Sequence, residues 1–99
     1  MEIKTTKNDQ SVNIALTGRL DTNTSHELEE ELNTALDGVN ELTFDLTALD
    51  YISSAGLRVL LSAQKKMNEV QGSMKVTGAN KDVQEIFDVT GFSSIFNIV

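Results

Sequence analysis

The chain has 99 residues, 39% of them hydrophobic, and contains neither cysteine nor proline. That length is enough for one domain with a single core. Without cysteine there are no disulfides, no thiol catalysis and no thiolate metal sites, which is compatible with a reducing cytoplasm. The formal net charge of −7 argues against nucleic acid or an anionic membrane as a partner, because both would repel the surface. Partners with a basic patch are favoured instead.

The chain shows no sign of export or membrane insertion. No tract is long and apolar enough to span a bilayer, and residues 1–4 lack the charged and apolar regions of a secretory signal. No repeat, linker or low-complexity segment divides the chain. We therefore expect one soluble domain over residues 1–99, a monomer in the cytoplasm.

The N-terminal third predicts a hairpin followed by a helix. Residues 3–7 and 12–17 alternate as short strands around a polar turn at residues 8–10. After a turn at residues 18–21, Thr24 precedes Glu27 by the capping-box spacing, which predicts a helix start. The apolar stripe of this helix is Leu28, Leu32, Ala35 and Leu36, and residues 37–38 end it.

The rest of the chain alternates strands and helices. We expect a strand over 42–46, a helix over about 55–70 closed by Gly72, and a strand over 74–77. A helix over 81–89, capped by Asn80 and closed by Gly91, and a short strand within 95–99 follow. Such alternation implies parallel pairing through crossovers, and the N-terminal hairpin makes the sheet mixed. The fold class is α/β.

The junction between the expected strand and the second helix carries two adjacent serines. Ser53 and Ser54 come just before Gly56, where the first N–H groups of the new helix lack intrahelical acceptors and the helix dipole favours negative charge. A phosphate would be tolerated there. The alternative is that one serine simply caps the helix.

The segment from Tyr51 to Arg58, Tyr-Ile-Ser-Ser-Ala-Gly-Leu-Arg, resembles the signature of the STAS domain. It is most similar to that of stand-alone bacterial anti-sigma-factor antagonists, which place a phosphorylatable serine two residues before the glycine. In this chain that serine is Ser54. Residues 18–21, Gly-Arg-Leu-Asp, resemble the G-x-L-D turn of the family, and residues 44–46 and 83–92 its central strand and closing helix.

The resemblance runs from about Ile3 to the C-terminus and implies the STAS fold: a mixed, mostly parallel sheet with an N-terminal hairpin and helices packed mainly on one face. One position departs from the family. Antagonists of this type often carry aspartate directly before the phosphorylated serine, and here that residue is Ser53. Ser53 is therefore an alternative phosphate acceptor.

By this resemblance, the unphosphorylated chain binds an anti-sigma factor with serine-kinase activity, so that a sigma factor is released. Phosphorylation reverses the binding and a serine phosphatase restores it. A phosphoserine adds about −1.5 to −2 charge and three acceptor oxygens, which a helix N-terminus stabilises but a partner's acidic or apolar contact surface does not. The partner-binding residues expected from the signature and the turn are Asp21, Ser53, Ser54, Ala55, Gly56, Leu57 and Arg58.

Three of these residues have a second, purely structural interpretation. Gly56 either lets another chain approach closely or allows tight packing of helix on strand. Asp21 either lies near Ser54 at the same rim of the sheet or is an ordinary turn residue. Arg58, four positions after Ser54, can reach a phosphate across one helical turn or is merely solvated. Asp45 and Asp50 are expected to close the strand and its turn.

An enzymatic function has little support in the sequence. A serine hydrolase of the elbow type needs glycine two residues before its nucleophile, and Ile52 stands there before Ser54. The single histidine, His26, lies in a polar run and is expected at the surface. We therefore predict no catalytic residue.

The sequence also predicts neither a metal site nor a cofactor. One histidine and no cysteine leave only carboxylates, and Asp21, Asp45 and Asp50 lack calcium-loop spacing. No phosphate-binding glycine loop is present, so a partner must bring ATP. The alternative function is a STAS docking subunit of an ABC-type permease or an anion transporter, without phosphorylation.

Overall fold

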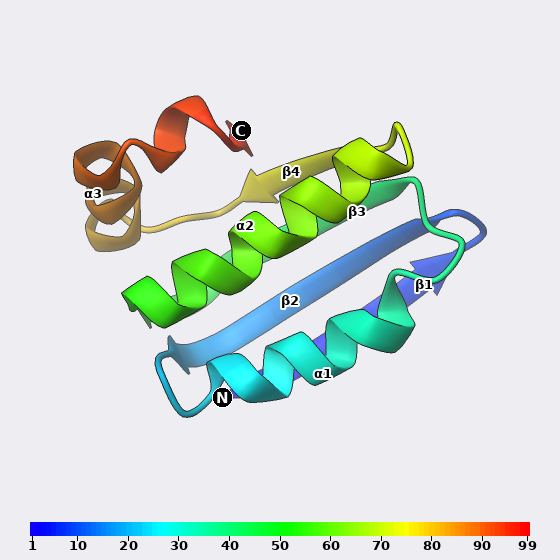
Figure 1. Cartoon of the computed structure of the whole chain (residues 1–99). Helices are drawn as coiled ribbons and strands as arrows, with labels where there is room; N and C mark the ends of the chain where they lie inside the picture. Colours follow the sequence, from blue (N-terminus) through cyan, green and yellow to red (C-terminus); the bar gives the residue numbers. More distant parts are fainter.

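The computed structural model describes residues 1–99. Its elements, in chain order, are β1 (Glu2–Asn8), β2 (Ser11–Leu20), α1 (Ser25–Ala35), β3 (Glu41–Ile52), α2 (Ser54–Glu69), β4 (Ser73–Thr77), α3 (Lys81–Thr90), the 3-10 turn η1 (Phe92–Ser94) and β5 (Asn97–Ile98). The strands form one five-stranded sheet in the order β1-β2-β3-β4-β5 (Figure 1). Only β1 and β2 pair antiparallel; all other pairs are parallel, which confirms the mixed, mostly parallel sheet.

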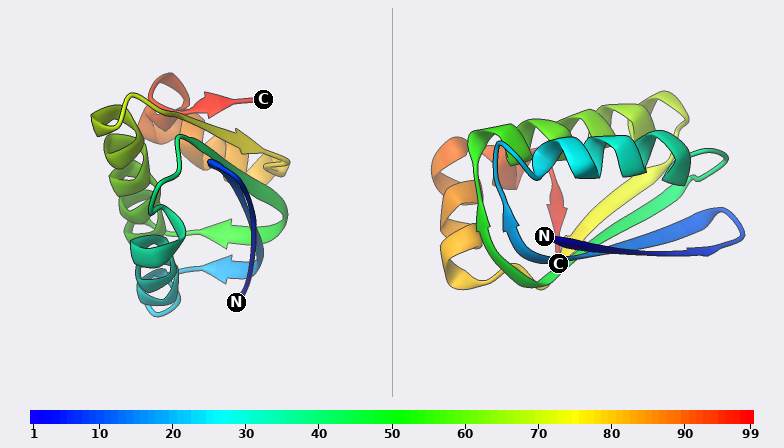
Figure 2. Two further views of the ribbon diagram at one scale, coloured as in Figure 1. Left: turned by 90° about the vertical axis from the view of Figure 1, so that its right-hand side faces the viewer. Right: turned by 90° about the horizontal axis from the view of Figure 1, so that it is seen from below.

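Two helices cover one face of this sheet. α1 and α2 lie side by side on that face, while α3 lies across the end of the sheet where β4 ends and most of the opposite face is left uncovered (Figure 2). This arrangement confirms helices packed mainly on one face.

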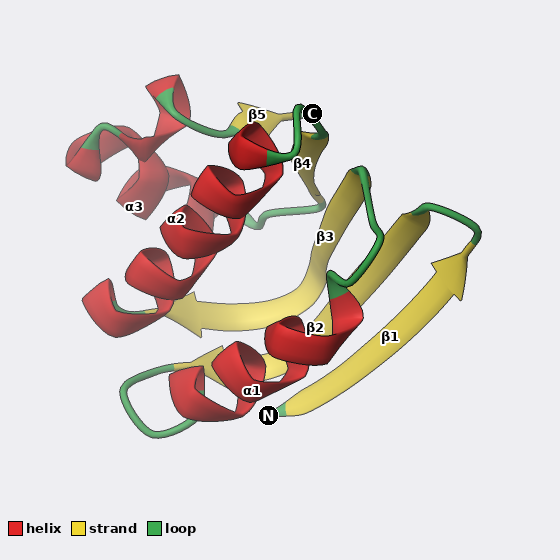
Figure 3. Ribbon diagram, turned by 45° about the vertical axis from the view of Figure 1, so that its right-hand side comes forward, coloured by secondary structure: helices red, strands yellow, loops and turns green.

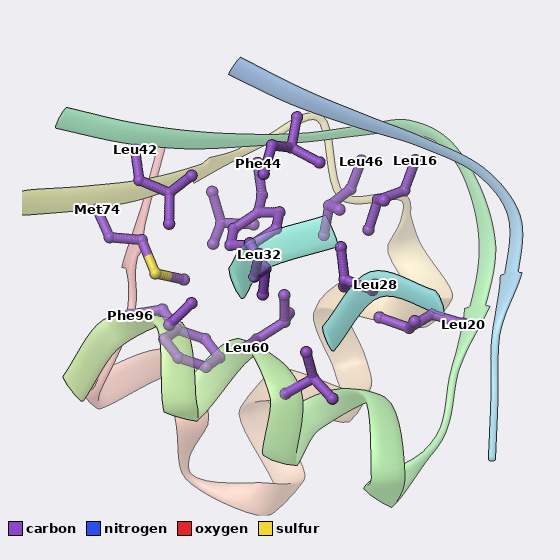
Figure 4. Packing of buried hydrophobic residues seen from close by; sticks show 14 of the residues in the cluster. Leu16, Leu20, Leu28, Leu32, Leu42, Phe44, Leu46, Leu60, Met74 and Phe96 are labelled. Carbon is purple, nitrogen blue, oxygen red and sulfur yellow. The ribbon is translucent and has the colours of Figure 1, made fainter. Parts of the chain in front are cut away.

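The core lies between the sheet and the helices. It is a cluster of 24 buried hydrophobic residues, in which Leu28 and Leu32 of α1 and Leu60 of α2 face Leu42 and Phe44 of the sheet (Figure 4). The apolar stripe predicted for α1 is buried throughout. On α2 and α3, Leu60 and Phe87 are fully buried, whereas the neighbouring Leu61 and Ile86 are only partly buried.

The longest strand, β3, does not end at Leu46 as the sequence predicted but continues to Ile52. A register shift interrupts its pairing with β2: Ala15 pairs with Asp45, but Thr17 pairs with Ala48. Beyond this bulge the buried residues of β3 are three apart, so the alternation that marks a strand in the sequence is lost. Figure 3 shows β3 bending along its length.

Asp45 and Asp50 therefore lie within β3 and do not close it, contrary to expectation. The Asp45 carboxylate accepts hydrogen bonds from the Thr47 hydroxyl at 2.6 Å and the Thr47 N–H at 3.0 Å. These two bonds hold the pKa of Asp45 below its usual value of 3.8, and the bond from the hydroxyl has the larger effect. The role of Asp45 is thus to stabilise the bulge.

The capping box predicted at Thr24 does not form. Thr24 has helical backbone angles and its side chain makes no cap bond to α1. Its hydroxyl instead donates to the Arg19 carbonyl at 2.7 Å and accepts from the Asp21 N–H at 2.9 Å. The Asp21 carboxylate closes the turn before α1, because it accepts from the N–H groups of Asn23 and Thr24, each at 3.0 Å.

The end of α2 also differs from the prediction. Gln71, and not Gly72, adopts the left-handed conformation after the helix, with φ +59°. Gly72 is needed for another reason, because a Cβ atom there would lie 2.6 Å from the Asn40 carbonyl oxygen. At α3, by contrast, the predicted boundaries are confirmed: Asn80 accepts from the Val83 N–H at 2.8 Å, and Gly91 ends the helix with φ +83°.

Candidate functional site

The exposed end of the β2–β3 pair brings two distant parts of the chain together. Leu20 pairs with Ile52 across the parallel strands, and the Ser53 N–H donates to the Leu20 carbonyl at 2.9 Å. The turn after β2 and the start of α2 therefore lie side by side at one end of the sheet (Figure 1). We call the residues Asp21, Ser53 and Ser54 the serine rim.

The two serines of the rim have different environments. Ser53 is the N-cap of α2: its backbone is extended, and its hydroxyl oxygen accepts the Gly56 N–H at 3.3 Å while its carbonyl accepts the Leu57 N–H at 2.9 Å. Ser53 is half-buried, whereas Ser54 is the first residue of the helix and exposed. The hydroxyl of Ser54 is thus the one offered to solvent at the positive end of the helix dipole.

Asp21 lies at this rim, next to the residue whose carbonyl binds Ser53. Its pKa is lowered below the usual value of 3.8, first by the hydrogen bond from the Thr24 N–H, which outweighs desolvation. The Thr24 hydroxyl, the Asn23 N–H and the charge of Arg19 lower it further. The carboxylate is therefore held ionised and fixed in place.

Arg19 and Tyr51 form a pair that the sequence analysis missed. They are register partners on β2 and β3, and the guanidinium carbon lies 4.3 Å from the centre of the ring. Tyr51 is 36% exposed. Each residue directly precedes a buried strand residue, Leu20 or Ile52, so alternation along the strand would have predicted its side chain on the outer face of the sheet.

The remaining signature residues divide into buried and exposed ones. Gly56 is buried, and a Cβ atom there would lie 2.7 Å from Leu20 Cγ, so its small size serves the packing of α2 on the sheet. Leu57 is 4% exposed and belongs to the core. Ala55 and Arg58, in contrast, line a shallow hollow between α1 and α2.

That hollow begins beside the serine rim. It is lined by the N-terminal parts of both helices and the turn before α1, through Thr22, Ser25, His26, Glu29, Ala55, Arg58, Val59 and Ser62. His26 is exposed there, as expected. The structure contains no group of three or more His, Cys, Asp or Glu side chains arranged to hold a metal ion. None of its helices combines the length and the apolar character needed to cross a membrane.

Comparisons with known proteins identify the family of this fold. A family model for the STAS domain matches residues 2–99. A Bordetella bronchiseptica protein named as a candidate anti-sigma factor antagonist, BtrV, is 37% identical over 99 residues, covering 99% of this chain and 85% of that protein. The anti-sigma-B factor antagonist of Staphylococcus aureus is 26% identical, with 99% and 92% coverage.

A solved structure has the same fold. It is that of the anti-sigma factor antagonist SpoIIAA in its unphosphorylated form, which superimposes with a TM-score of 0.87 at 18% sequence identity. The match covers 99% of this chain and 88% of that one.

Proposed function

This chain belongs to the STAS domain family, and on that premise we propose that it is an anti-sigma factor antagonist controlled by phosphorylation of Ser54. Relatives that align along nearly the whole chain carry the name of anti-sigma factor antagonist, at 37% and 26% identity. The unphosphorylated form binds an anti-sigma factor and thereby frees a sigma factor; the phosphorylated form does not bind.

The observation that carries the choice of Ser54 is the contrast between the two serines of the rim. The Ser53 hydroxyl oxygen already caps α2, while Ser54 is exposed at the first helical position. Phosphorylation of Ser54 leaves the cap in place, and the helix N-terminus stabilises the added charge. The modification therefore changes the surface without unfolding the domain.

The effect on a partner follows from charge and volume. Before phosphorylation, the partner's surface fits a neutral hydroxyl at Ser54. After phosphorylation, it meets a group with a charge of about −1.5 to −2 on a chain whose net charge is already −7. Desolvating that group in a contact is costly unless the partner supplies cations at that point. Arg58, exposed one turn after Ser54, then binds the phosphate within the chain itself.

The other signature residues support the same surface in two ways. The partner contacts Ser54, Ala55 and Asp21. Gly56 and Leu57 instead pack into the core and so fix how far the first turn of α2 lies from the sheet. The partner is an anti-sigma factor with serine-kinase activity, opposed by a serine phosphatase. The chain itself is not an enzyme: it is a monomeric substrate and switch that acts in the cytoplasm.

The test is binding of the anti-sigma factor encoded beside the gene for this chain, measured by calorimetry. Ser54→Ala should bind as the unmodified chain does, and Ser54→Asp should bind poorly. Ser73→Asp is the matched control, because Ser73 is exposed at the opposite end of the sheet, where it pairs with Glu41 at the start of β3. Equal binding by Ser54→Asp and Ser73→Asp would overturn the switch at Ser54, whereas absence of binding by the unmodified chain would favour a docking subunit of a transporter that needs no phosphorylation.

A further inference from the structure

The pair formed by Arg19 and Tyr51 has a place in the fold that core packing does not explain. The ring of Tyr51 is 36% exposed at the end of β3, with the Arg19 guanidinium carbon 4.3 Å from its centre. Large aromatic rings dominate core and interface energetics when they are buried, so an exposed one at a functional rim is informative.

The two side chains lie on the face of the sheet opposite α2. Their chain neighbours Leu20 and Ile52 are buried, and a Cβ atom on Gly56 of α2 would touch both of them. Because side chains alternate along a strand, Arg19 and Tyr51 point to the other face, which carries neither α1 nor α2 (Figure 2). The pair thus extends the serine rim around the end of the sheet.

The stack fixes both side chains in advance. A guanidinium over an aromatic face is held by cation–π attraction, and stacking through its plane leaves the N–H groups on its edge able to donate. Side chains that are ordered before association lose less entropy on binding. Arg and Tyr are also among the residues that most often dominate interface energies.

The charges around the stack indicate what it binds. Arg19 is a cation among acidic neighbours: its charge contributes to the lowered pKa of Asp21, and Asp50 is exposed next to Tyr51. The chain as a whole, at −7, attracts a basic surface. Within such a surface, Arg19 is complementary to a carboxylate, which its planar fork binds through two hydrogen bonds.

We propose that Arg19 and Tyr51 are an anchor for the anti-sigma factor, receiving one acidic side chain on Arg19 and an adjacent apolar side chain on the open part of the Tyr51 ring. This inference rests on the proposed function, since it names a second contact for the same partner. The anchor fixes how the partner is aligned on this chain. Basic groups of the partner face Asp21, and a single carboxylate of the partner faces Arg19.

A cross-strand pair can also serve the sheet alone. In that case substitutions at Arg19 or Tyr51 change the stability of the domain and leave its affinity for the partner unchanged. Conservative variants separate the two roles. Tyr51→Phe keeps the ring, and Arg19→Lys keeps the charge but loses the planar stack and the fork.

The experiment measures the dissociation constant for the anti-sigma factor encoded beside this gene, together with a thermal melt of each variant. Tyr51→Ala and Arg19→Ala should each weaken binding by about 30-fold or more, the range of interface hot spots. Arg19→Lys should weaken it by about tenfold through loss of the bidentate contact. Tyr51→Phe should bind within about threefold of the unmodified chain, because the ring supplies most of the contact.

Val70→Ala is the control, since Val70 is 53% exposed at the far end of α2, and it should not change affinity. Unchanged affinity in Tyr51→Ala, Arg19→Ala and Arg19→Lys overturns the anchor. If an alanine variant fails to fold, unchanged affinity in Arg19→Lys alone overturns the anchor.

The result for Ser54→Asp separates this inference from the proposed function. Loss of binding by Ser54→Asp with unchanged binding by Tyr51→Ala removes the anchor and leaves the switch. Loss by Tyr51→Ala with unchanged binding by Ser54→Asp removes the switch and leaves the anchor. Absence of binding by the unmodified chain overturns both.

Discussion

The backbone N–H of Ser53 donates to the carbonyl of Leu20 at 2.9 Å. This bond continues the parallel pairing of β2 and β3 by one step beyond Ile52 and joins the first residue outside β3 to the last residue of β2. The rim at which Asp21, Ser53 and Ser54 meet is therefore an extension of the sheet. Its geometry depends on strands whose packing is already set by the core.

The cap of α2 yields the first prediction. Ser53→Ala removes the acceptor for the Gly56 N–H and should lower the free energy of unfolding by about 0.5–2 kcal/mol. Ser53→Asp keeps an acceptor and adds a negative charge at the helix N-terminus, so it should restore the stability. Urea unfolding measures both. Ser54→Ala, which leaves the cap intact, should stay within about 0.5 kcal/mol of the unmodified chain. The opposite order of the two alanine variants would mean that Ser54 is the cap.

The core stripe of α2 is tested by two adjacent leucines. Leu60 is fully buried, and Leu60→Ala should cost about 2–5 kcal/mol. Leu61 is only partly buried, so Leu61→Ala should cost clearly less. Equal losses in urea melts would contradict the position of α2 on the sheet.

The residue after α2 offers a stabilising substitution. Gln71 has φ +59°, a conformation that costs L-residues roughly 1–2 kcal/mol but is open to glycine. Replacing Gln71 by glycine removes this cost. Part of the gain is offset because glycine has more conformational freedom in the unfolded chain, which is worth about 0.4–1 kcal/mol. Gln71→Gly should therefore raise the free energy of unfolding by about 0.5–1 kcal/mol.

Gly91→Ala is the converse of that substitution. Gly91 has φ +83° and open space around its Cα, so alanine there should lower the free energy of unfolding through backbone strain alone. For the substitution after α2, a loss of stability in Gln71→Gly would contradict the left-handed conformation assigned to Gln71.

The bulge in β3 predicts a pH dependence. The pKa of Asp45 is lowered in the folded chain, so between the folded value and the usual 3.8 the unfolded chain binds more protons. The stability linked to Asp45 is therefore present above the unfolded pKa and is lost as the pH falls through the folded pKa. In denaturant melts from about pH 2 to pH 5, Asp45→Asn should flatten this acid loss. Thr47→Val, which removes the hydroxyl that lowers the pKa of Asp45 most, should flatten it in part. An unchanged acid slope in Asp45→Asn would exclude this role.

Local signals were sufficient where a boundary depends on neighbouring residues only. The start and end of α3 were predicted because Asn80 and Gly91 act within one turn of the helix. The extension of β3 to Ile52 was not, because a bulge across from Ala15 and Thr17 breaks the alternation. The capping box predicted at Thr24 was wrong for a similar reason: the Thr24 hydroxyl donates to the Arg19 carbonyl, outside the helix.

The same distinction applies to the candidate site. Resemblance placed Ser54 and Asp21 at one rim, and the pairing of Leu20 with Ile52 brings these segments together. Which serine caps α2 depends on the backbone angles at Ser53, and the stack of Arg19 on Tyr51 depends on pairing between strands far apart in sequence. Neither follows from a single stretch of sequence.

The central claim is that Ser54, and not Ser53, is the residue through which binding is controlled. The most direct measurement is site-resolved mass spectrometry after incubation with the neighbouring anti-sigma factor and ATP, followed by gel filtration of the two proteins together. We predict one phosphate, on Ser54, and loss of the complex once it is present. A phosphate on Ser53, no phosphate on either serine, or a complex that survives modification of Ser54 would contradict this account.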